Sequence, residues 1–309
     1  MATVPHLRIG TRGSALARWQ AEWTAARLAE LGTSVELVLI RTTGDRQQEG
    51  PVAGLGSEGV FTKELQYALL DHRIDLAVHS LKDLPTAGPE GLTLGAVPER
   101  APVADCLISR DGVTFSELKS GARIGTGSTR RRSQLWHARR DLEMLDLRGN
   151  VDTRLRKLDD GEFDAIVLAE AGLRRLGLAA RITEVLPLSL MLPAVGQGAL
   201  GIEIRADDPQ TAELLRPLNH DATFAAVRSE RAMLAALHGG CLAPVAGWGR
   251  VESGVLHLTG VVTSLDGVRR LEAVISGDAE DAEHLGEFIA TELIAKGAAK
   301  LIDAARKSS

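Results

Sequence analysis

The stretch Leu7-Arg-Ile-Gly-Thr-Arg-Gly-Ser14 consists of a short apolar strand and a turn, and residues 15–31 follow with apolar side chains at helical spacing. Ser14 is a residue type favoured at a helix N-cap. Strand-like and helix-like segments continue to alternate over the first two-thirds of the chain. This alternation predicts an α/β fold with mainly parallel sheets.

The chain length and the positions of Pro and Gly predict the domain organisation. The 309 residues exceed the size at which one hydrophobic core usually continues to grow. Pro and Gly cluster near residues 97–102 and 192–199, so we expect the chain to cross between two lobes there. We find no internal repeat in the sequence. The predicted parts are a first α/β lobe (residues 1–98 and 199–217), a second α/β lobe (103–193) and a small C-terminal α+β domain (220–309).

Composition and charge limit the classes of function. The chain is 44% hydrophobic and 25% charged, which is typical of a globular protein, and its net charge is -5. A negative chain has no overall field that attracts nucleic acid or an anionic membrane, so an anion site requires a local cluster of Arg or Lys. No apolar segment is long enough to span a bilayer, and the N-terminus lacks the pattern of a secretory signal. We therefore expect a cytoplasmic protein with no nucleic-acid or membrane partner.

The densest cluster of functional residue types is Gly125-Thr-Gly-Ser-Thr-Arg-Arg-Arg132, a turn followed by the start of a helix. Backbone N–H groups and the helix dipole make such a turn an anion site, and Arg suits carboxylates or phosphates. Cations are disfavoured at a helix N-terminus, so the three arginines predict that a bound anion compensates them. A solvated basic face is the alternative interpretation.

Two further junctions between a strand and a helix also carry Arg. Leu147-Arg-Gly-Asn150 is followed by Arg154 one helical turn later, and Arg12 follows the first strand of the chain. Open α/β sheets bind ligands at the carboxyl ends of their strands. A cleft lined by Arg from two lobes would suit a ligand with several carboxylates.

The segment Ser80-Leu-Lys-Asp-Leu-Pro85 follows a buried strand that ends at His79. An Asp beside a cleft rich in cations would stay ionised, so Asp83 could hold a ligand N–H or stabilise a developing positive charge. The alternative is a turn with a surface ion pair. His79 lies within the apolar strand and fits a core histidine better than a catalyst.

The chain contains two cysteines without the spacing of a metal or redox motif, and no metal site is expected. Gly239-Gly240 before Cys241 and Pro244 after it describe a tight turn that could present the thiol as a nucleophile or attachment point. The alternative is a small core residue, which is the interpretation we give to Cys106 in its apolar run. Residues 44–59 are rich in Gly and predict a mobile surface loop.

These segments together resemble the porphobilinogen deaminase family from end to end. The resemblance is specific because it consists of several motifs in a fixed order. The motifs are Thr11-Arg-Gly-Ser-Ala-Leu-Ala-Arg-Trp-Gln20, Phe61-Thr-Lys-Glu-Leu65, Asp75-Leu-Ala-Val-His-Ser-Leu-Lys-Asp-Leu-Pro85, Leu147-Arg-Gly-Asn-Val151, Leu192-Pro-Ala-Val-Gly-Gln-Gly-Ala199, and Ser229-Glu-Arg-Ala-Met233 leading to Gly239-Gly-Cys241.

The resemblance implies two lobes built like periplasmic binding proteins and a third domain with a dipyrromethane cofactor, joined to Cys241 as a thioether. It also implies the head-to-tail condensation of four porphobilinogen molecules in haem and tetrapyrrole biosynthesis. Each substrate would lose ammonia to give a methylene pyrrolenine, which the free α-position of the growing chain attacks, and water would finally release hydroxymethylbilane. The expected partner is porphobilinogen alone, and the expected state is a monomer.

The resemblance also assigns roles to single residues. Asp83 matches the catalytic carboxylate, which would bind pyrrole N–H groups and stabilise the cationic intermediate as ammonia leaves. The chain departs from the family pattern at Glu58, Gly127 and His238, where Lys, Ser and Glu respectively are frequent. The residues that match cofactor or substrate binders are Arg12, Ser14, Ser80, Lys82, Thr126, Ser128, Arg130, Arg131, Arg148, Arg154 and Gln197.

Two other classes of function compete with this one. A two-lobed solute-binding protein would explain the arginines but not a third domain that delivers a cysteine. A phosphate-handling transferase would explain the turn at residues 125–128. That turn lacks the G-x-x-x-x-G-K-[ST] pattern, however, and residues 10–13 do not supply G-x-G-x-x-G.

Overall fold

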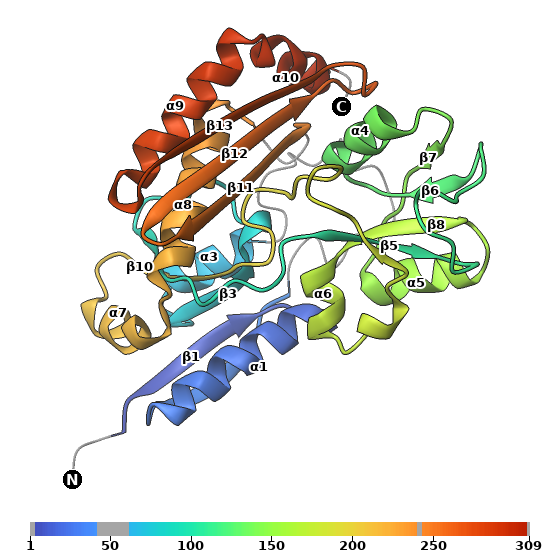
Figure 1. Ribbon diagram of the computed structural model, residues 1–309. Helices are drawn as coiled ribbons and strands as arrows, with labels where there is room; N and C mark the ends of the chain where they lie inside the picture. The colour runs from blue at the N-terminus through green and yellow to red at the C-terminus, as the bar shows by residue number, and fades with distance from the viewer. Residues whose placement is uncertain (1–3, 42–61, 240–242, 308–309) are drawn as a thin grey trace. The chain divides into compact units, whose positions relative to one another are not determined.

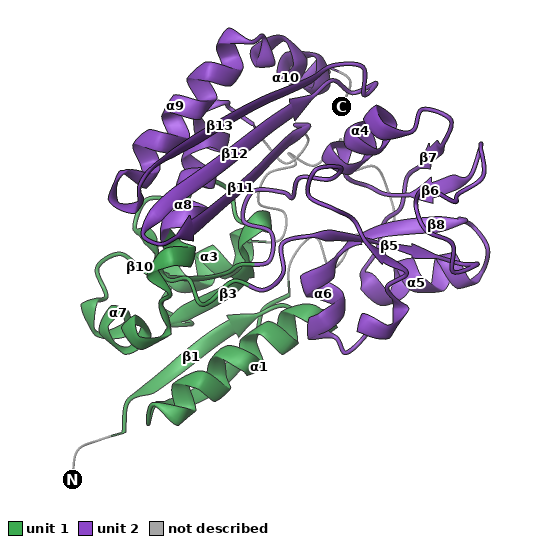
Figure 2. Ribbon diagram, in the orientation of Figure 1, with its two compact units in different colours: residues 1–100, 199–224 green, residues 101–198, 225–309 purple. Residues whose placement is uncertain are grey.

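The computed structural model describes residues 4–41, 62–239 and 243–307. The chain divides into two compact units, residues 1–100 with 199–224 and residues 101–198 with 225–309 (Figure 2). The predicted second lobe and the C-terminal part of the chain therefore share one unit, and the three-part division stays a prediction. Two expected features, the mobile loop at 44–59 and the displayed thiol of Cys241, lie outside the described residues.

The first lobe is a five-stranded sheet with helices after its strands (Figure 1). Its elements are β1 (His6–Thr11), α1 (Ala15–Glu30), β2 (Ser34–Leu39), α3 (Lys63–Leu70), β3 (Leu76–Ser80), β4 (Leu92–Ala96), β10 (Leu200–Arg205) and α7 (Pro209–Leu215). The strand order is β2-β1-β3-β10-β4. β1 is parallel to β2 and β3, whereas β10 is antiparallel to β3 and β4.

The second lobe contains another five-stranded sheet. Its elements are β5 (Asp105–Ser109), β6 (Arg123–Gly125), α4 (Thr129–Ala138), β7 (Glu143–Leu145), α5 (Val151–Asp159), β8 (Ala165–Ala169), α6 (Glu170–Arg175) and β9 (Glu184–Val185). The strand order is β7-β6-β8-β5-β9. β6 is parallel to β7 and β8, whereas β5 is antiparallel to β8 and β9.

The two lobes share one plan, strand for strand. β6, β7, β8, β5 and β9 occupy the places of β1, β2, β3, β10 and β4. The sequence Arg-Ile-Gly-Thr recurs at residues 8–11 and 123–126, at the equivalent strands β1 and β6. The chain therefore contains a structural repeat, and the expectation of no internal repeat is wrong. Most equivalent positions differ in residue type, which hides the repeat from the sequence.

The predicted fold class is confirmed, with one refinement. Two α/β lobes of the same strand order accompany a small C-terminal α+β part. Both lobe sheets are mixed rather than mainly parallel, because one strand of each lobe runs antiparallel to both of its neighbours. These strands are β10 in the first lobe and β5 in the second.

An ion-pair cluster, which we call the Arg–Asp clamp, holds the first lobe at the amino ends of β1 and β3. Asp75 Oδ2 accepts hydrogen bonds from Arg8 N at 2.8 Å and Arg8 Nε at 3.0 Å. Asp75 Oδ1 accepts from Arg8 Nη2 at 2.8 Å and from Arg205 Nη2 at 3.5 Å. Burial alone would raise the pKa of Asp75, but the hydrogen bonds from Arg8 hold it below its ordinary value.

The second lobe contains the equivalent clamp. Asp164 Oδ2 accepts from Arg123 N at 2.8 Å and from Arg123 Nε at 3.3 Å, and Oδ1 accepts from Arg123 Nη2 at 3.1 Å. Arg110 Nη2 reaches the same Oδ1 at 3.4 Å, just as Arg205 does in the first lobe. The hydrogen bonds from Arg123 lower the pKa of Asp164. Each clamp thus joins three neighbouring strands at one edge of the sheet, β1, β3 and β10 in the first lobe and β6, β8 and β5 in the second.

The C-terminal part is an antiparallel sheet covered by helices on one face. Its elements are α8 (Asp221–Ala236), β11 (Val245–Glu252), β12 (Val255–Thr263), β13 (Arg270–Asp278), α9 (Ala282–Ala295) and α10 (Ala298–Lys307). α9 and α10 lie along the sheet (Figure 1). Gly247 and Gly260 are paired across β11 and β12, and a Cβ on either would collide with the Met233 side chain. The glycine pair therefore makes the space in which Met233 packs.

Buried polar contacts join the C-terminal part to the second lobe. Glu230 on α8 is fully buried and accepts from Gly196 N at 2.6 Å and Gly249 N at 2.7 Å. Gly247 N donates to Pro193 O at 3.0 Å. The segment that leads out of the second lobe is therefore fixed to the first strand of the C-terminal sheet.

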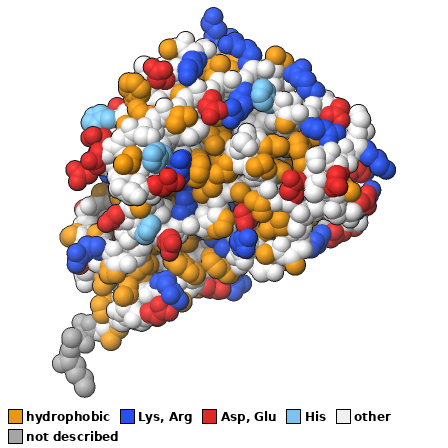
Figure 3. Space-filling view, in the orientation of Figure 1, with side chains coloured by type: hydrophobic (Ala, Val, Ile, Leu, Met, Phe, Trp, Pro, Cys, Tyr) orange, Lys and Arg blue, Asp and Glu red, His pale blue; other side chains and the backbone are white. Residues whose placement is uncertain are grey.

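Charges of both signs are interspersed on the molecular face shown in Figure 3. That distribution agrees with a modest net charge of -5 and makes local clusters the relevant anion sites. None of the helices within the described residues is long and apolar enough to cross a membrane.

The clamp predicts a specific pH dependence of stability. An Asp75→Asn variant should lose about 2 kcal/mol of unfolding free energy at pH 7, because charge-assisted hydrogen bonds are lost. The Asp75 pKa is lowered in the folded state, so this contribution is complete above the unfolded pKa of about 3.9 and disappears as the pH falls through the folded pKa. Urea unfolding from pH 7 downward measures the difference. A difference between parent and variant that stays constant into strong acid would contradict the role of the carboxylate.

Candidate active site

Five predicted site residues lie at the carboxyl edge of the first-lobe sheet. β1 and β3 are parallel neighbours, so their carboxyl ends meet at one edge. Arg12 and Ser14 follow β1, while Ser80, Lys82 and Asp83 lie at and after the end of β3. This edge therefore combines two cations, two hydroxyls and one carboxylate.

Hydrogen bonds from α1 fix the two strand ends of this edge. Ser14 caps α1 by accepting from Ala17 N at 3.3 Å. Thr11 Oγ1 donates to Ala17 O at 3.0 Å, which ties the end of β1 to the same helical turn. Gln20 Nε2 donates to Ser80 Oγ at 2.7 Å and joins α1 to the end of β3.

Asp83 ends a short 3-10 turn, Leu81–Asp83, directly after β3. Leu81 and Leu84 are buried and anchor the turn in the core, whereas Asp83 is exposed and Lys82 is half-buried. Leu81 N also donates to Ala199 O at 3.0 Å. The fold thus holds the backbone of the turn while it presents the Asp83 carboxylate at the sheet edge.

The second lobe places a capped turn at the equivalent edge. Thr126 N donates to Leu145 O at 2.9 Å, and Ser128 caps α4 by accepting from Arg131 N at 3.4 Å. A Cβ on Gly127 would lie 2.8 Å from Leu147 O. A side chain at residue 127 would therefore push the turn away from the end of β7.

Arg130 and Arg131 of this turn form a buried triad with Asp105. Asp105 Oδ2 accepts from Arg130 Nη2 at 2.8 Å. Asp105 Oδ1 accepts from Arg131 Nη2 at 2.7 Å, Arg131 Nε at 3.0 Å and Gln197 Nε2 at 3.0 Å. Asp105 and Gln197 are fully buried, and the two arginines are 5% and 6% exposed. Burial lowers the pKa of Arg130.

The triad corrects the argument that a bound anion compensates the three arginines. Asp105 pairs with Arg130 and Arg131, and Asp146 Oδ1 accepts from Arg132 Nη2 at 3.0 Å. Two protein carboxylates therefore compensate part of the charge of the three arginines, and one positive charge stays in excess. The arginine side chains can reach them because the helix N-terminus lies beside the start of β5 and the end of β7. Arg130 Nε is nevertheless buried without a hydrogen-bond partner among the described residues.

Arg148 and Arg154 belong to the next strand end of the second lobe. Arg148 is exposed, and its Nε lies 3.5 Å from Asp146 Oδ2. Arg154, in the first turns of α5, donates from Nε to Gly149 O at 2.7 Å. β6 and β7 are parallel neighbours, so the carboxyl end of β7 lies at the same edge of the sheet as the turn between β6 and α4. The second lobe thus carries cations at two adjacent junctions.

Two residues near these edges escaped the sequence analysis. Asp105 opens an otherwise apolar strand, and a lone carboxylate in that position was a signal that it needs a buried partner. Arg175 donates from Nη2 to Gly198 O at 2.7 Å, and burial lowers its pKa to about 10. Its role could not be inferred locally, because the partner lies beyond the next strand in the sequence.

Two of the sequence interpretations concern residues that the structure places in the core. His79 is buried and its Nε2 lies 3.1 Å from Glu203 Oε2, as expected of a core histidine with a partner. Cys106 is fully buried, and its thiol donates to Leu168 O at 3.3 Å. Burial raises the pKa of the Cys106 thiol to about 12, so this cysteine is not a nucleophile.

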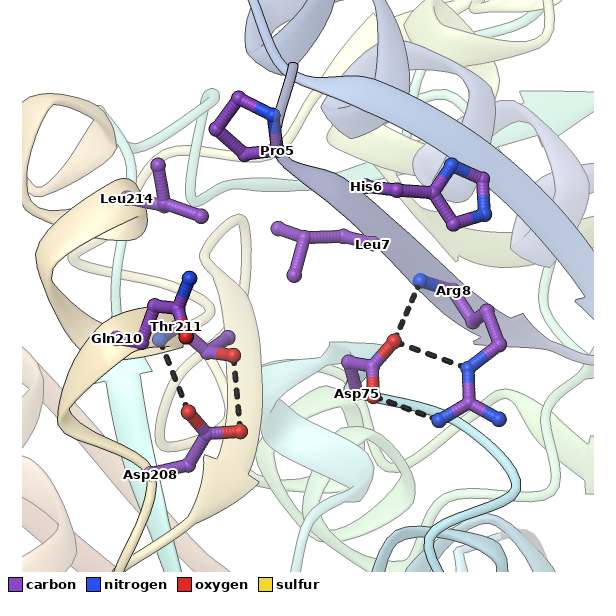
Figure 4. A pocket seen from close by; sticks show the side chains of 9 residues that line it. All are labelled: Pro5, His6, Leu7, Arg8, Asp75, Asp208, Gln210, Thr211 and Leu214. Carbon is purple, nitrogen blue, oxygen red and sulfur yellow. Dashed lines mark hydrogen bonds and ion pairs between the residues drawn. The ribbon is translucent and has the colours of Figure 1, made fainter. Parts of the chain in front are cut away.

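A pocket of about 330 Å³ lies at the opposite, amino-terminal edge of β1 (Figure 4). Arg8 and Asp75 of the clamp line one side, and Asp208 and Thr211 line the other. Asp208 is engaged by Thr211 N at 3.0 Å and by Arg205 Nη2 at 2.7 Å. The charged groups of this pocket thus pair with each other, which suits a structural role better than the recognition of a ligand.

These features define a class of protein. Two α/β lobes present cations at the carboxyl edges of their sheets, and a small α+β part accompanies them, as suits a protein that handles a ligand with several carboxylates.

Comparison with known proteins narrows the class. The family models "Porphobilinogen deaminase, dipyromethane cofactor binding domain" and "Porphobilinogen deaminase, C-terminal domain" match residues 7–213 and 224–295. The chain belongs to the porphobilinogen deaminase family.

Curated relatives extend the similarity over the whole chain. The porphobilinogen deaminase of Moorella thermoacetica is 48% identical over 305 residues, which cover 98% of this chain and 97% of the relative. That of Desulforudis audaxviator is 51% identical over 296 residues, which cover 95% and 96%. Among solved structures, the chain is similar to the methionine binding protein MetQ, at 15% identity and a TM-score of 0.43, over 69% of this chain and 88% of that chain.

The burial of Cys106 predicts its reactivity. In a Cys241→Ser variant, no thiol should react with a disulfide reagent at about pH 8 while the protein is native, because the remaining thiol is buried and protonated. One thiol should react after unfolding in guanidinium. Absorbance of the released thiolate measures both numbers. Rapid labelling of the native variant would show that Cys106 is accessible and would contradict its structural role.

Proposed function

We propose that this chain performs its family's reaction with Asp83 as the catalytic carboxylate and Cys241 as the anchor of a dipyrromethane group. As a porphobilinogen deaminase, the chain is a transferase of tetrapyrrole biosynthesis. It joins four porphobilinogen molecules head to tail, releases ammonia and forms hydroxymethylbilane. The observation that supports the residue assignments is that each lobe gathers its predicted binders at the carboxyl edge of its own sheet.

Asp83 suits the step in which the substrate loses ammonia. The bond between the methylene carbon and nitrogen breaks, its electron pair leaves with the nitrogen, and positive charge spreads over the methylene carbon and the pyrrole ring. A carboxylate that accepts the pyrrole N–H stabilises that charge more strongly as it develops. The 3-10 turn presents the Asp83 carboxylate at the sheet edge, which gives it access to such a substrate.

The charged residues of both edges suit the acidic side chains of the pyrroles. Porphobilinogen carries an acetate and a propionate group, and guanidinium groups bind carboxylates in bidentate geometry. The unsatisfied Nε of buried Arg130 is a donor that such a carboxylate could complete. We therefore assign the binding of substrate or cofactor carboxylates to Arg12, Ser14, Ser80, Lys82, Thr126, Ser128, Arg130, Arg131, Arg148, Arg154 and Gln197.

Cys241 is the cysteine to which we assign the cofactor. The chain has two cysteines, and Cys106 is buried with a raised pKa. A bound dipyrromethane group supplies the free pyrrole α-carbon to which the first substrate is joined. In each lobe, cationic side chains that follow strand ends, such as Lys82 and Arg148, suit acidic groups of the kind that a dipyrromethane carries.

The net charge and the state of the described cysteine bear on the compartment and partners of the enzyme. We propose a cytoplasmic monomer whose partner is the small molecule porphobilinogen. The net charge of -5 gives no general attraction for nucleic acid. A described thiol that is buried and has no disulfide partner agrees with a reducing compartment.

Intact mass tests the covalent anchor. The purified parent should exceed its sequence mass by two linked pyrrole units, and a Cys241→Ser variant should not, because a thioether requires the sulfur. The control is Cys106→Ser, which should keep the added mass. If the parent stays unmodified even after incubation with porphobilinogen or hydroxymethylbilane, the anchor assignment is wrong. A solute-binding protein without catalysis would behave in that way.

Replacing Asp83 by Asn tests the catalytic carboxylate. The variant should fold and carry the pyrrole group, while kcat falls by about 100-fold or more, because a neutral amide stabilises the developing cation poorly. Steady-state consumption of porphobilinogen measures kcat and KM. Asp71→Asn, an exposed carboxylate paired with Arg73 at the opposite end of β3, is the matched control and should keep kcat. Equal kcat values for the two variants would remove Asp83 from the mechanism.

A further inference from the structure

The repeat allows the two carboxyl edges to be compared residue by residue. Ser14 and Ser128 cap α1 and α4, and six residues later each helix carries a buried glutamine, Gln20 or Gln134. The helical positions therefore correspond one to one. Arg130 and Arg131 stand two and three residues after their cap, where the first lobe has Leu16 and Ala17.

The carboxylate partner of these arginines also has a counterpart in the first lobe. Asp105 is opposite Ala169 at the end of β8, and Leu200 is opposite Ser80 at the end of β3. Since β8 and β3 occupy the same place in their sheets, Asp105 and Leu200 are equivalent. Both are buried, with exposed fractions of 0% and 4%. The apolar trio of Leu16, Ala17 and Leu200 thus corresponds to the charged triad of Arg130, Arg131 and Asp105.

This comparison indicates that the charged triad at the carboxyl edge of the second lobe is not needed for the lobe to fold. The same sheet and helix start form in the first lobe without any charge at the three positions, so the plan of the lobe does not require the triad. The triad also introduces two cations for one carboxylate, and it leaves Arg130 Nε without a partner among the described residues. Buried ion clusters often contribute little net stability compared with apolar side chains of similar volume.

We infer that Asp105 is a positioning residue for the anion-binding edge of the second lobe. It holds Arg130 and Arg131 in place and leaves one positive charge in excess within the triad, which a carboxylate of the pyrrole ligand complements. The inference rests on the proposed binding of acidic pyrroles at this edge, and it adds Asp105 to the residues that determine affinity. Asp105 acts through the arginines and does not touch the reacting atoms.

A pair of variants tests this role. Asp105→Leu alone leaves two buried cations without their carboxylate, so its melting temperature should fall by about 10 °C. The triple variant D105L/R130M/R131M makes all three positions apolar, as in the first lobe, and methionine preserves much of the length of each side chain. Its melting temperature should return to within about 4 °C of the parent, because no unpaired charge remains. Its KM for porphobilinogen should rise at least about tenfold, or its pyrrole loading by intact mass should be lost.

Asp164→Asn is the matched control. It removes a carboxylate that pairs with an arginine in the same sheet, at the opposite edge. This variant should lose stability while KM for porphobilinogen and pyrrole loading stay as in the parent. A purely structural role of the triad would make the two carboxylate sites behave alike.

Two results would overturn the inference. A triple variant as unstable as Asp105→Leu would show that the triad belongs to the folding core. A stable triple variant with parental KM and loading would show that the edge binds its ligand without the triad. Failure of the proposed function is distinguishable from both, since the parent itself would then neither consume porphobilinogen nor carry pyrrole mass.

Discussion

The Arg–Asp clamp is the interaction on which both lobes depend. In each lobe one carboxylate, Asp75 or Asp164, accepts from the backbone and the guanidinium of the arginine that precedes Ile-Gly-Thr. These bonds fix the register of β1 and β3 in the first lobe, and of β6 and β8 in the second, at the amino ends of the strands. Because parallel strands of fixed register end together, the residues after both strands gather at the opposite edge. The clamp thus lies at the edge of each sheet opposite to the predicted site residues.

The two carboxyl edges have the same backbone plan and different chemistry. The first carries an exposed carboxylate, Asp83, on a turn anchored by buried leucines, and the second carries arginines at two junctions. The proposed reaction uses both kinds of group, a carboxylate for the loss of ammonia and cations for the acidic side chains. The shared plan explains how one chain supplies them, since each lobe positions the ends of its strands in the same way and varies only the residues placed there.

Local patterns predicted the secondary-structure elements and the strand ends at which the predicted site residues stand. The helix expected over residues 15–31 is α1, and the Gly/Ser/Thr turn before Arg130 caps a helix as expected, because capping and periodicity act over a few residues. Long-range pairings were missed. The partner of Arg131 lies 26 residues away in a strand that runs antiparallel, and the repeat is marked by only one shared tetrapeptide. Neither the Arg131–Asp105 pairing nor the repeat can be deduced from local sequence patterns.

A crystal structure of the chain with its covalent pyrrole group would test most directly the separation of structural and chemical edges. We expect the acetate and propionate groups to lie within hydrogen-bond distance of residues that follow the carboxyl ends of the strands. Acidic groups bound instead at the amino-terminal edge, in the pocket of Arg8 and Asp75, would contradict this expectation.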